Sequence, residues 1–319
     1  MTFFNDKESH NNILNFNTPK YTFWCIIYRI FTETEMPRLP EYLKRPIIDT
    51  EKTKTVRHIL KDKCLNTVCE GARCPNKSEC YAKNTATFLI MGNVCTRNCR
   101  YCNIATAKPE PLDSEEPRRI AEAVKELGLK YAVITSVTRD DLPDGGAKHF
   151  KECLDEIRKI SDAKIEILTP DFRQGEFCLD IIIKAHPEVF NHNIETVKSL
   201  FKIARPQGNY DLSLNVLKYI KEHSDIVTKS GFMVGLGENL NEIEETLVDL
   251  KESGVDIVTI GQYIQPSKAH LQVEKYYTLE EFEQLKLLAK KVGIRNYQIS
   301  PLVRSSYQAM NSWKNAKEQ

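Results

Sequence analysis

The sequence predicts an α/β protein whose core is a partial (β/α)6 TIM-like barrel with N- and C-terminal extensions. Three observations support this fold class. Short apolar runs alternate with amphipathic helical patterns from about residue 85 onward, as in strand–helix units around a parallel sheet. Six such pairs occur, too few for a closed barrel of eight units. Polar or glycine-rich motifs directly follow several runs, at the strand ends where such sheets bind ligands.

The six expected strands are short and bounded by turn residues. In chain order they are TATFLIMG at 85–92, YAVITSV at 131–137, AKIEIL at 163–168, EVFNHNI at 188–194, GFMVGLG at 231–237 and DIVTIGQY at 256–263. Helical patterns follow them at 115–127, 150–160, 177–185, 211–223, 241–253 and 278–292. In the first helix Ile120, Val124 and Leu127 share one face, and Asp211 is the expected N-cap of the fourth. A doubly wound sheet fits the same periodicity.

Four segments are expected along the chain. Residues 1–35 are Asn-rich without sustained periodicity, and two interpretations stay open: a native but poorly ordered extension, or residues that precede a true start at Met36. Residues 36–84 form an N-terminal segment with one group of cysteines. Residues 85–295 form the barrel, and 296–319 form a C-terminal segment that contains RSSY at 304–307.

Composition narrows the class of function. Lys and Arg total 45 against 44 for Asp and Glu, so no global field favours nucleic acid or an anionic membrane. The apolar run FWCIIYRIF at 23–31 is about half the length that a bilayer needs and contains Arg29. No signal peptide is recognisable, and we expect a cytoplasmic protein. Ten cysteines in a reducing compartment, six of them clustered, indicate metal binding or catalysis.

The first group of clustered cysteines directly follows the first expected strand. Cys95, Cys99 and Cys102 have the spacing CxxxCxxC, and a loop of this length can place three thiolates on three corners of an iron–sulfur cubane. The fourth iron then stays open to a ligand with amine and carboxylate groups. Structural zinc is the alternative, but it needs four ligands, and the CxxC at 99–102 has no second CxxC to pair with.

CxxxCxxC after the first strand of a βα series resembles the radical S-adenosylmethionine superfamily. A second triplet, Cys69, Cys74 and Cys80, narrows the resemblance. The runs NTVCEGARCPNKSEC, TATFLIMGNVCTRNCRYC, SVTRDDLPDGGAKHF, HNIETV, GLGE, QYIQPSKAHL and PLVRSSYQA resemble the lipoyl synthase family from about residue 45 to 310.

This resemblance implies two [4Fe–4S] clusters with different tasks. Cys95, Cys99 and Cys102 are the expected catalytic ligands of the cluster that reductively cleaves S-adenosylmethionine to a 5′-deoxyadenosyl radical. The second triplet is expected to hold an auxiliary cluster, with Ser306 of RSSY as its fourth ligand; spacing alone does not decide between Ser305 and Ser306. Hard oxygen is a poorer partner than thiolate for this iron, so the auxiliary cluster can be dismantled. Its sulfur is expected to enter C6 and C8 of a protein-bound octanoyl-lysine.

The resemblance also suggests which residues contact S-adenosylmethionine. Gly145 and Gly146 of DLPDGG either form a tight turn or let the backbone come close to the methionine amine. Two interpretations apply to Asn193, Glu195 and Arg205. They either form a capped turn with a solvated Arg, or they bind the methionine carboxylate and the ribose of the cofactor. Gly235 of GLGEN is expected on the adenine side.

The expected partners follow from the same resemblance. They are octanoylated lipoyl carrier proteins, either the glycine cleavage H protein or E2 lipoyl domains, a reductant such as ferredoxin or flavodoxin, and iron–sulfur cluster supply proteins. Two other functions stay open. One is another two-cluster radical enzyme, methylthiotransferase-like or biotin-synthase-like, and the other is a non-enzymatic iron–sulfur carrier.

Overall fold

The computed structural model describes residues 38–46, 50–83 and 86–318, and all of these except Arg38 belong to one compact unit, Leu39–Gln319. The interpretations of residues 1–35 and of Met36 lie outside the described residues. No helix in the described part of the chain is long and apolar enough to cross a membrane.

One eight-stranded sheet forms the core, and its strand order is β1-β2-β5-β6-β7-β8-β9-β10. Its strands are β1 (Asn66–Thr67), β2 (Thr87–Ile90), β5 (Tyr131–Ser136), β6 (Lys164–Leu168), β7 (Val189–Asn191), β8 (Val227–Val234), β9 (Ile257–Gln262) and β10 (Asn296–Ile299). Neighbouring strands are parallel except β1 and β2. Because β1 and β10 are the two ends of this order, the sheet is an incomplete barrel, and the predicted fold class is confirmed.

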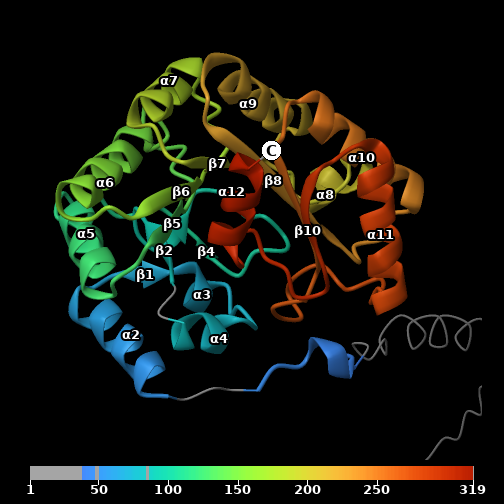
Figure 1. Ribbon diagram of the computed structural model, residues 1–319, viewed down its shortest axis with the longest axis horizontal. Coiled ribbons are helices and arrows are strands. Elements are labelled where there is room, and N and C mark those ends of the chain that lie inside the picture. Colours follow the sequence, from blue (N-terminus) through green and yellow to red (C-terminus); the bar gives the residue numbers. More distant parts are fainter. Residues whose placement is uncertain (1–37, 47–49, 84–85, 319) are drawn as a thin grey trace, which may run out of the picture. The chain divides into compact units, whose positions relative to one another are not determined.

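Helices surround the curved sheet, one after each of six parallel strands (Figure 1). They are α5 (Glu116–Glu126), α6 (Ala147–Ile160), α7 (Glu176–Ala185), α9 (Tyr210–His223), α10 (Leu240–Glu252) and α11 (Leu279–Val292). The apolar stripe of each helix packs on the sheet, as Ile120 and Val124 of α5 do with at most 1% exposure. All six predicted strand–helix units are therefore present.

Three details differ from the prediction. The N-cap of α9 is Asn209, whose side chain accepts the Leu212 N–H at 3.0 Å, whereas Asp211 lies in the first turn. β8 begins at Val227, four residues before the predicted start, because polar residues at its beginning are buried inside the barrel. β10 extends the sheet beyond the six predicted strands by pairing with β9.

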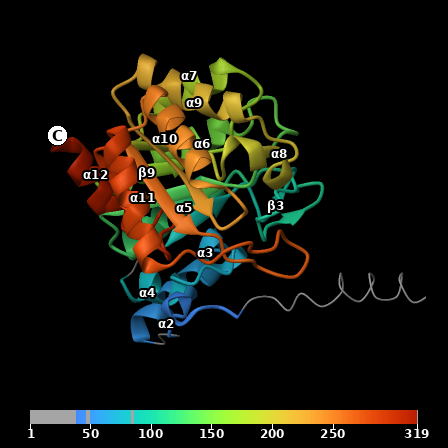
Figure 2. The same ribbon diagram turned by 90° about the vertical axis from the view of Figure 1, so that its right-hand side faces the viewer.

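The N-terminal segment packs beside β1 and β2. It contains η1 (Glu41–Leu43), α2 (Glu51–Asp62), α3 (Val68–Gly71) and α4 (Lys77–Ala82). The helices α2, α3 and α4 lie together on one side of the barrel in both views (Figure 2).

A C-terminal helix, α12 (Ala309–Lys317), closes one end of the barrel. Its residues Ala309, Met310 and Trp313 pack on a cluster made by the first residues of several strands, including Tyr131, Val189 and Val227. Figure 2 shows α12 at one end of the barrel and β3 at the other. The end at which the parallel strands finish is therefore left for the functional site.

A buried ion pair lies inside the barrel. Lys229 Nζ of β8 lies 3.0 Å and 3.2 Å from the two carboxylate oxygens of Glu166 on β6, and the side chains are 0% and 1% exposed. Tyr131 donates to the same carboxylate at 2.8 Å and Asn191 at 3.1 Å. These bonds explain why a charged residue is tolerated within β8.

We expect Glu166→Gln to lower the free energy of unfolding by about 3–5 kcal/mol, because it leaves the Lys229 ammonium buried without a counter-charge. The double variant Glu166→Leu with Lys229→Met should recover most of that loss, since it removes both charges. Denaturant unfolding of the three proteins measures the difference. Equal stability of Glu166→Gln and the parent would contradict this account of the pair.

Candidate active site

The loop with the first cysteine triplet is closed at its base by a small sheet. In this sheet β3 (Val94–Cys95) pairs in parallel with β4 (Ala105–Thr106). The Ala107 N–H donates to the Cys95 carbonyl at 3.3 Å, and Thr106 Oγ1 donates to the Arg97 carbonyl at 2.9 Å. The chain therefore leaves β2, forms a narrow loop that contains all three cysteines, and returns toward α5.

Burial and the proximity of other thiols raise the pKa of Cys99 and of Cys102. Burial, and to a smaller extent charge on Cys99 and Cys95, raises the pKa of Cys102 to about 12. The pKa of Cys99 is also raised, first by burial, against the favourable charge of Arg205. Cys95 Sγ accepts two backbone N–H bonds, from Thr138 at 3.3 Å and from Arg97 at 3.4 Å. Thiols that are crowded together away from water ionise readily only when a cation is beside them. This set of three sulfur donors therefore fits an iron–sulfur cluster.

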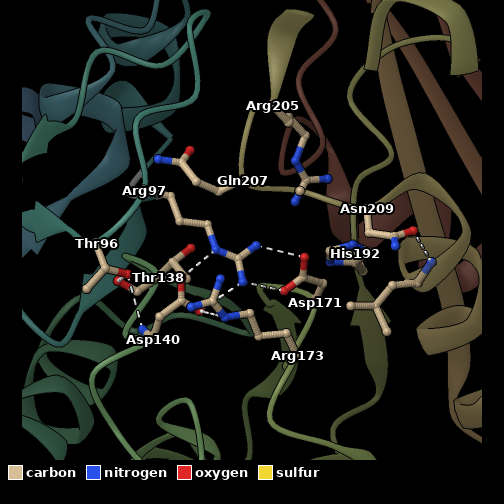
Figure 3. A network of polar contacts seen from close by, with 12 residues as sticks. Thr96, Arg97, Thr138, Asp140, Asp171, Arg173, His192, Arg205, Gln207 and Asn209 are labelled. Atoms are coloured by element: carbon tan, nitrogen blue, oxygen red, sulfur yellow. Dashed lines mark hydrogen bonds and ion pairs between the residues drawn. The ribbon is translucent and has the colours of Figure 1, made fainter. Parts of the chain in front are cut away.

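A buried arginine fastens the middle of this loop to two strand ends. Arg97 Nε and Nη2 donate to the carboxylate of Asp140 at 2.7 Å and 2.8 Å, and Nη1 and Nη2 donate to that of Asp171 at 2.7 Å each (Figure 3). Asp140 follows β5 and Asp171 follows β6. Desolvation opposes the charge of Asp171, but the Arg97 guanidinium holds its pKa below the usual value. Sequence reasoning missed this cluster of charges.

Three further segments hold the rest of the loop. The Arg100 N–H donates at 2.8 Å to the carbonyl of Ala204, the last residue of α8 (Phe201–Ala204). The Leu271 N–H donates to the Arg100 carbonyl at 3.0 Å, and His270 Nε2 lies 3.0 Å from the Cys102 carbonyl. Asn103 Nδ2 donates to the Gly71 carbonyl at 2.8 Å, which links the loop to the N-terminal segment.

Asn193, Glu195 and Arg205 lie together beside this loop. Arg205 Nη1 donates to the Asn193 carbonyl at 3.1 Å. Burial raises the pKa of Glu195, and the positive charge of Arg205 opposes that rise. Beside the larger effect of burial, the charge of Arg205 lowers the pKa of the Cys99 thiol and the charge of Glu195 raises it.

The three predicted glycines lie in turns and have positive φ angles. Gly145 and Gly146 have φ of +59° and +89° and form the turn into α6. A Cβ at Gly146 would lie 2.3 Å from Met91 Sδ, and one at Gly145 would lie 2.7 Å from Gln174 Oε1. Gly235, with φ of +105°, donates its N–H to Glu238 Oε1 at 2.6 Å. Turn geometry and close packing therefore explain why glycine occupies these three positions.

Several buried polar atoms at the finishing ends of the strands and at the end of α8 have no partner within the described part of the chain. They are Ser136 Oγ, Thr169 Oγ1, His192 Nε2, Asn193 Oδ1 and Arg205 Nε. His192 Nδ1 lies 2.8 Å from the Thr169 carbonyl, and burial lowers its pKa to about 4, so the ring is neutral and Nε2 is an acceptor. Buried polar atoms normally have partners. These atoms fit a ligand with amine, carboxylate and hydroxyl groups such as S-adenosylmethionine; sequence reasoning did not single out Ser136, Thr169 and His192.

The second cysteine triplet forms a separate cluster of thiols. Cys69 lies in α3, Cys74 in the turn that follows, and Cys80 in α4. Burial raises the pKa of Cys80 to about 12, with further contributions from charge on Cys69 and Cys74. Burial also raises the pKa of Cys69 to about 11. This set, like the first, offers three mutually interacting soft ligands.

The C-terminal segment reaches the barrel interior through one close backbone contact. A Cβ at Gly261 of β9 would lie 2.2 Å from the Val303 carbonyl oxygen, so only glycine allows the segment to pass there. Asn76 Nδ2 then donates to the Leu302 carbonyl at 2.7 Å, and the Tyr307 hydroxyl donates to Glu79 Oε1 at 3.1 Å. These bonds attach residues 301–307 to the segment that carries the second triplet.

The two serines of RSSY point to different surroundings. Ser306 and Cys80 line the same cavity of about 360 Å³. Asn193 Nδ2 instead donates to Ser305 Oγ at 3.3 Å, on the side of the first triplet. Burial lowers the pKa of the neighbouring Arg304, and negative charge on Cys74 and on Glu195 opposes that shift.

Neither triplet is placed as a site for a single metal ion. No group of three or more His, Cys, Asp or Glu side chains among residues 38–46, 50–83 and 86–318 has that arrangement. All nine cysteines in these ranges are free thiols, with Cys64 exposed and Cys153 and Cys178 buried away from the triplets.

Comparison with known proteins identifies the family. The model of the Radical SAM superfamily matches residues 89–250. The lipoyl synthase of Caldanaerobacter subterraneus subsp. tengcongensis is 49% identical over 273 residues, which cover 85% of this chain and 96% of that protein. Lipoyl synthase 2 of Gloeobacter violaceus is 51% identical over 279 residues, which cover 87% of this chain and 96% of that protein. The chain belongs to the lipoyl synthase family.

A solved structure supports the fold independently. SuiB of Streptococcus suis, in a crystal structure bound to S-adenosylmethionine, superposes with a TM-score of 0.53 at 15% identity, covering 70% of this chain. This chain spans about half the length of that protein, 54%. As a member of the lipoyl synthase family, the chain is a radical enzyme of the sulfurtransferase class that uses S-adenosylmethionine and an iron–sulfur cluster.

The raised pKa values lead to a prediction for metal-free protein. Only the thiolate reacts with an alkylating agent, and at pH 8 a thiol with a pKa of about 12 is ionised in roughly one molecule in ten thousand. We expect Cys80 and Cys102 to be alkylated at least about a hundredfold more slowly than the exposed Cys64, with rates that rise about tenfold per pH unit. Mass spectrometry of peptides measures this, and comparable rates for the three thiols at pH 8 would contradict it.

Proposed function

We propose that the chain inserts two sulfur atoms, at C6 and C8, into an octanoyl group that is attached to a lysine of a carrier protein. The observation that supports this proposal most is the presence of two separate cysteine triplets with residues 301–307 between them. One triplet would serve radical formation and the other sulfur donation. This division of tasks is what the conversion of octanoyl-lysine to lipoyl-lysine requires.

We assign the first task to Cys95, Cys99 and Cys102. These three residues would hold a [4Fe–4S] cluster, which together with S-adenosylmethionine would supply a 5′-deoxyadenosyl radical able to remove hydrogen from an unactivated carbon. The buried Arg205, whose Nε has no partner in the described residues, can bind the carboxylate of the methionine part. Asn193 and Glu195 are suited to its amine and the ribose hydroxyls.

The glycines have an indirect part in this site. We propose that Gly145 and Gly146 hold the turn after β5 beside the methionine amine, and that Gly235 holds the turn after β8 on the adenine side. Their positive φ angles support the turn conformations, in which a side chain would be strained.

We assign sulfur donation to a second [4Fe–4S] cluster, on Cys69, Cys74 and Cys80, with Ser306 as its fourth ligand. The shared cavity of Ser306 and Cys80 supports this choice, as does the contact of Ser305 with Asn193 on the other side. Oxygen is a poorer ligand than thiolate for an iron that is surrounded by sulfide. A serine ligand would therefore make this iron the easier one to lose, which would suit a cluster that donates its sulfide.

The proposed reaction sets the class of partners. The substrate is an octanoylated carrier, such as the glycine cleavage H protein or an E2 lipoyl domain. A reductant such as ferredoxin or flavodoxin must supply electrons, and iron–sulfur supply proteins must rebuild a consumed cluster. Nine free thiols in the described residues suit the reducing cytoplasm that we propose as the compartment.

The test is anaerobic incubation of reconstituted protein with an octanoyl-lysyl peptide, S-adenosylmethionine and a reductant, followed by mass spectrometry. We expect a peptide that has gained two sulfur atoms, together with 5′-deoxyadenosine. Cys99→Ala should abolish both products, because it removes a ligand of the first cluster. Cys74→Ala should still form 5′-deoxyadenosine but no sulfur-containing peptide.

Cys64→Ala is the matched control, because Cys64 is an exposed cysteine only five residues from the second triplet. It should retain both products. A product with one sulfur and a methyl group would indicate a methylthiotransferase instead. Loss of 5′-deoxyadenosine in Cys74→Ala would refute separate tasks for the two triplets.

A further inference from the structure

The strongest unassigned feature is the charge cluster of Arg97, Asp140 and Asp171 beside the first triplet (Figure 3). The side chains of Arg97, Asp140 and Asp171 are 3%, 11% and 1% exposed. Burying three charged groups is costly unless each finds partners of opposite charge. Here the guanidinium makes four hydrogen bonds of 2.7–2.8 Å, and its planar fork is shared by two carboxylates.

The loop backbone couples this charge cluster to a cysteine ligand. Arg97 is two residues from both Cys95 and Cys99, and its own N–H donates to Cys95 Sγ at 3.4 Å. The neighbouring Thr96 makes two bonds to the Thr138 carbonyl, at 3.0 Å and 3.1 Å, and its hydroxyl accepts the Asp140 N–H at 3.1 Å. A change in the Arg97 side chain would therefore move a ligating sulfur, not only a surface loop.

The two carboxylates differ in their surroundings. Asp140 is also paired with Arg173, at 3.2 Å, and the side chain of Arg173 is 50% exposed. Asp171 is almost completely buried, with both of its oxygens on Arg97. Because water and Arg173 screen Asp140 more, the negative charge of Asp171 acts more strongly on its surroundings. Nearby net charge and hydrogen bonds to the sulfurs set the reduction potential of an iron–sulfur cluster.

We propose that Arg97 is a positioning residue that holds the three ligands of the radical-forming cluster in place, and that the buried carboxylate of Asp171 keeps the reduction potential of this cluster low. The inference rests on the proposed function of Cys95, Cys99 and Cys102 as cluster ligands. The two parts are separable: the fork of Arg97 supplies geometry, and Asp171 supplies charge. A low potential would suit a cluster whose task is to reduce S-adenosylmethionine.

The experiment uses the full chain with Cys69, Cys74 and Cys80 replaced by Ala, so that only the first cluster is present. After anaerobic reconstitution with iron and sulfide, two quantities are measured. One is the midpoint potential from a titration followed by electron paramagnetic resonance. The other is the rate of iron release to a chelator.

Charge and geometry should separate in two variants. Asp171→Asn should shift the midpoint potential to a more positive value, and Asp140→Asn should shift it less. Arg97→Lys keeps the positive charge but cannot bind two carboxylates bidentately. It should leave the potential close to that of the parent and release iron about ten to a hundred times faster, the usual effect of losing a partner of a metal ligand.

Glu166→Gln is the matched control, because it also removes the charge of a buried, ion-paired carboxylate, but one that is bonded to Lys229 and not to the cysteine loop. It should shift the midpoint potential far less than Asp171→Asn does. An equal shift of potential in Glu166→Gln and Asp171→Asn, or unchanged iron release in Arg97→Lys, would overturn the inference. A parent protein that binds no cluster would instead refute the proposed function itself, and the inference with it.

Discussion

The connection between the two cysteine triplets depends on the close passage of the C-terminal segment over Gly261. Without a Cβ on that residue of β9, the Val303 backbone can enter the incomplete barrel. From there Asn76 and Glu79 fasten residues 301–307 to the helices of the second triplet, while Ser305 reaches Asn193 beside the first. Because the sheet ends at β1 and β10, this segment and the N-terminal helices occupy a place that further strands would fill in a closed barrel. An open barrel thereby becomes a means of placing two cysteine triplets near one another.

The first triplet depends on a different kind of support. Its loop is fastened by a buried arginine, by backbone bonds to three distant segments and by a two-stranded sheet at its base. Beside it, His192, Asn193 and Arg205 present polar atoms that the described residues leave unpaired. Rigid ligands next to unsatisfied polar groups are typical of a preorganised cofactor site. Closure of the other barrel end by α12 leaves the finishing ends of the strands as the side for the reaction.

Local patterns predicted most of the fold and indicated the candidate ligands. Alternation of short apolar runs with amphipathic helices predicted six strand–helix units, and the spacing of six cysteines predicted both triplets. The rest depends on residues far apart in the chain. Arg97 meets partners 43 and 74 residues away, so no local motif reveals them. The sequence does not predict the start of β8, because Lys229 looks like a polar residue outside a buried strand. Its burial is explained only by the ion pair with Glu166, 63 residues away. The different surroundings of Ser305 and Ser306 likewise depend on residues far away in the sequence, Asn193 and Cys80.

The central claim is that two iron–sulfur clusters occupy this chain, one on each triplet. Anomalous diffraction at the iron absorption edge from anaerobically grown crystals tests it most directly. The account predicts two four-iron peaks, one bounded by Cys95, Cys99 and Cys102, and the other by Cys69, Cys74 and Cys80 with Ser306 completing its ligands. A single peak, single metal ions at the triplets, or Ser305 in place of Ser306 would contradict it.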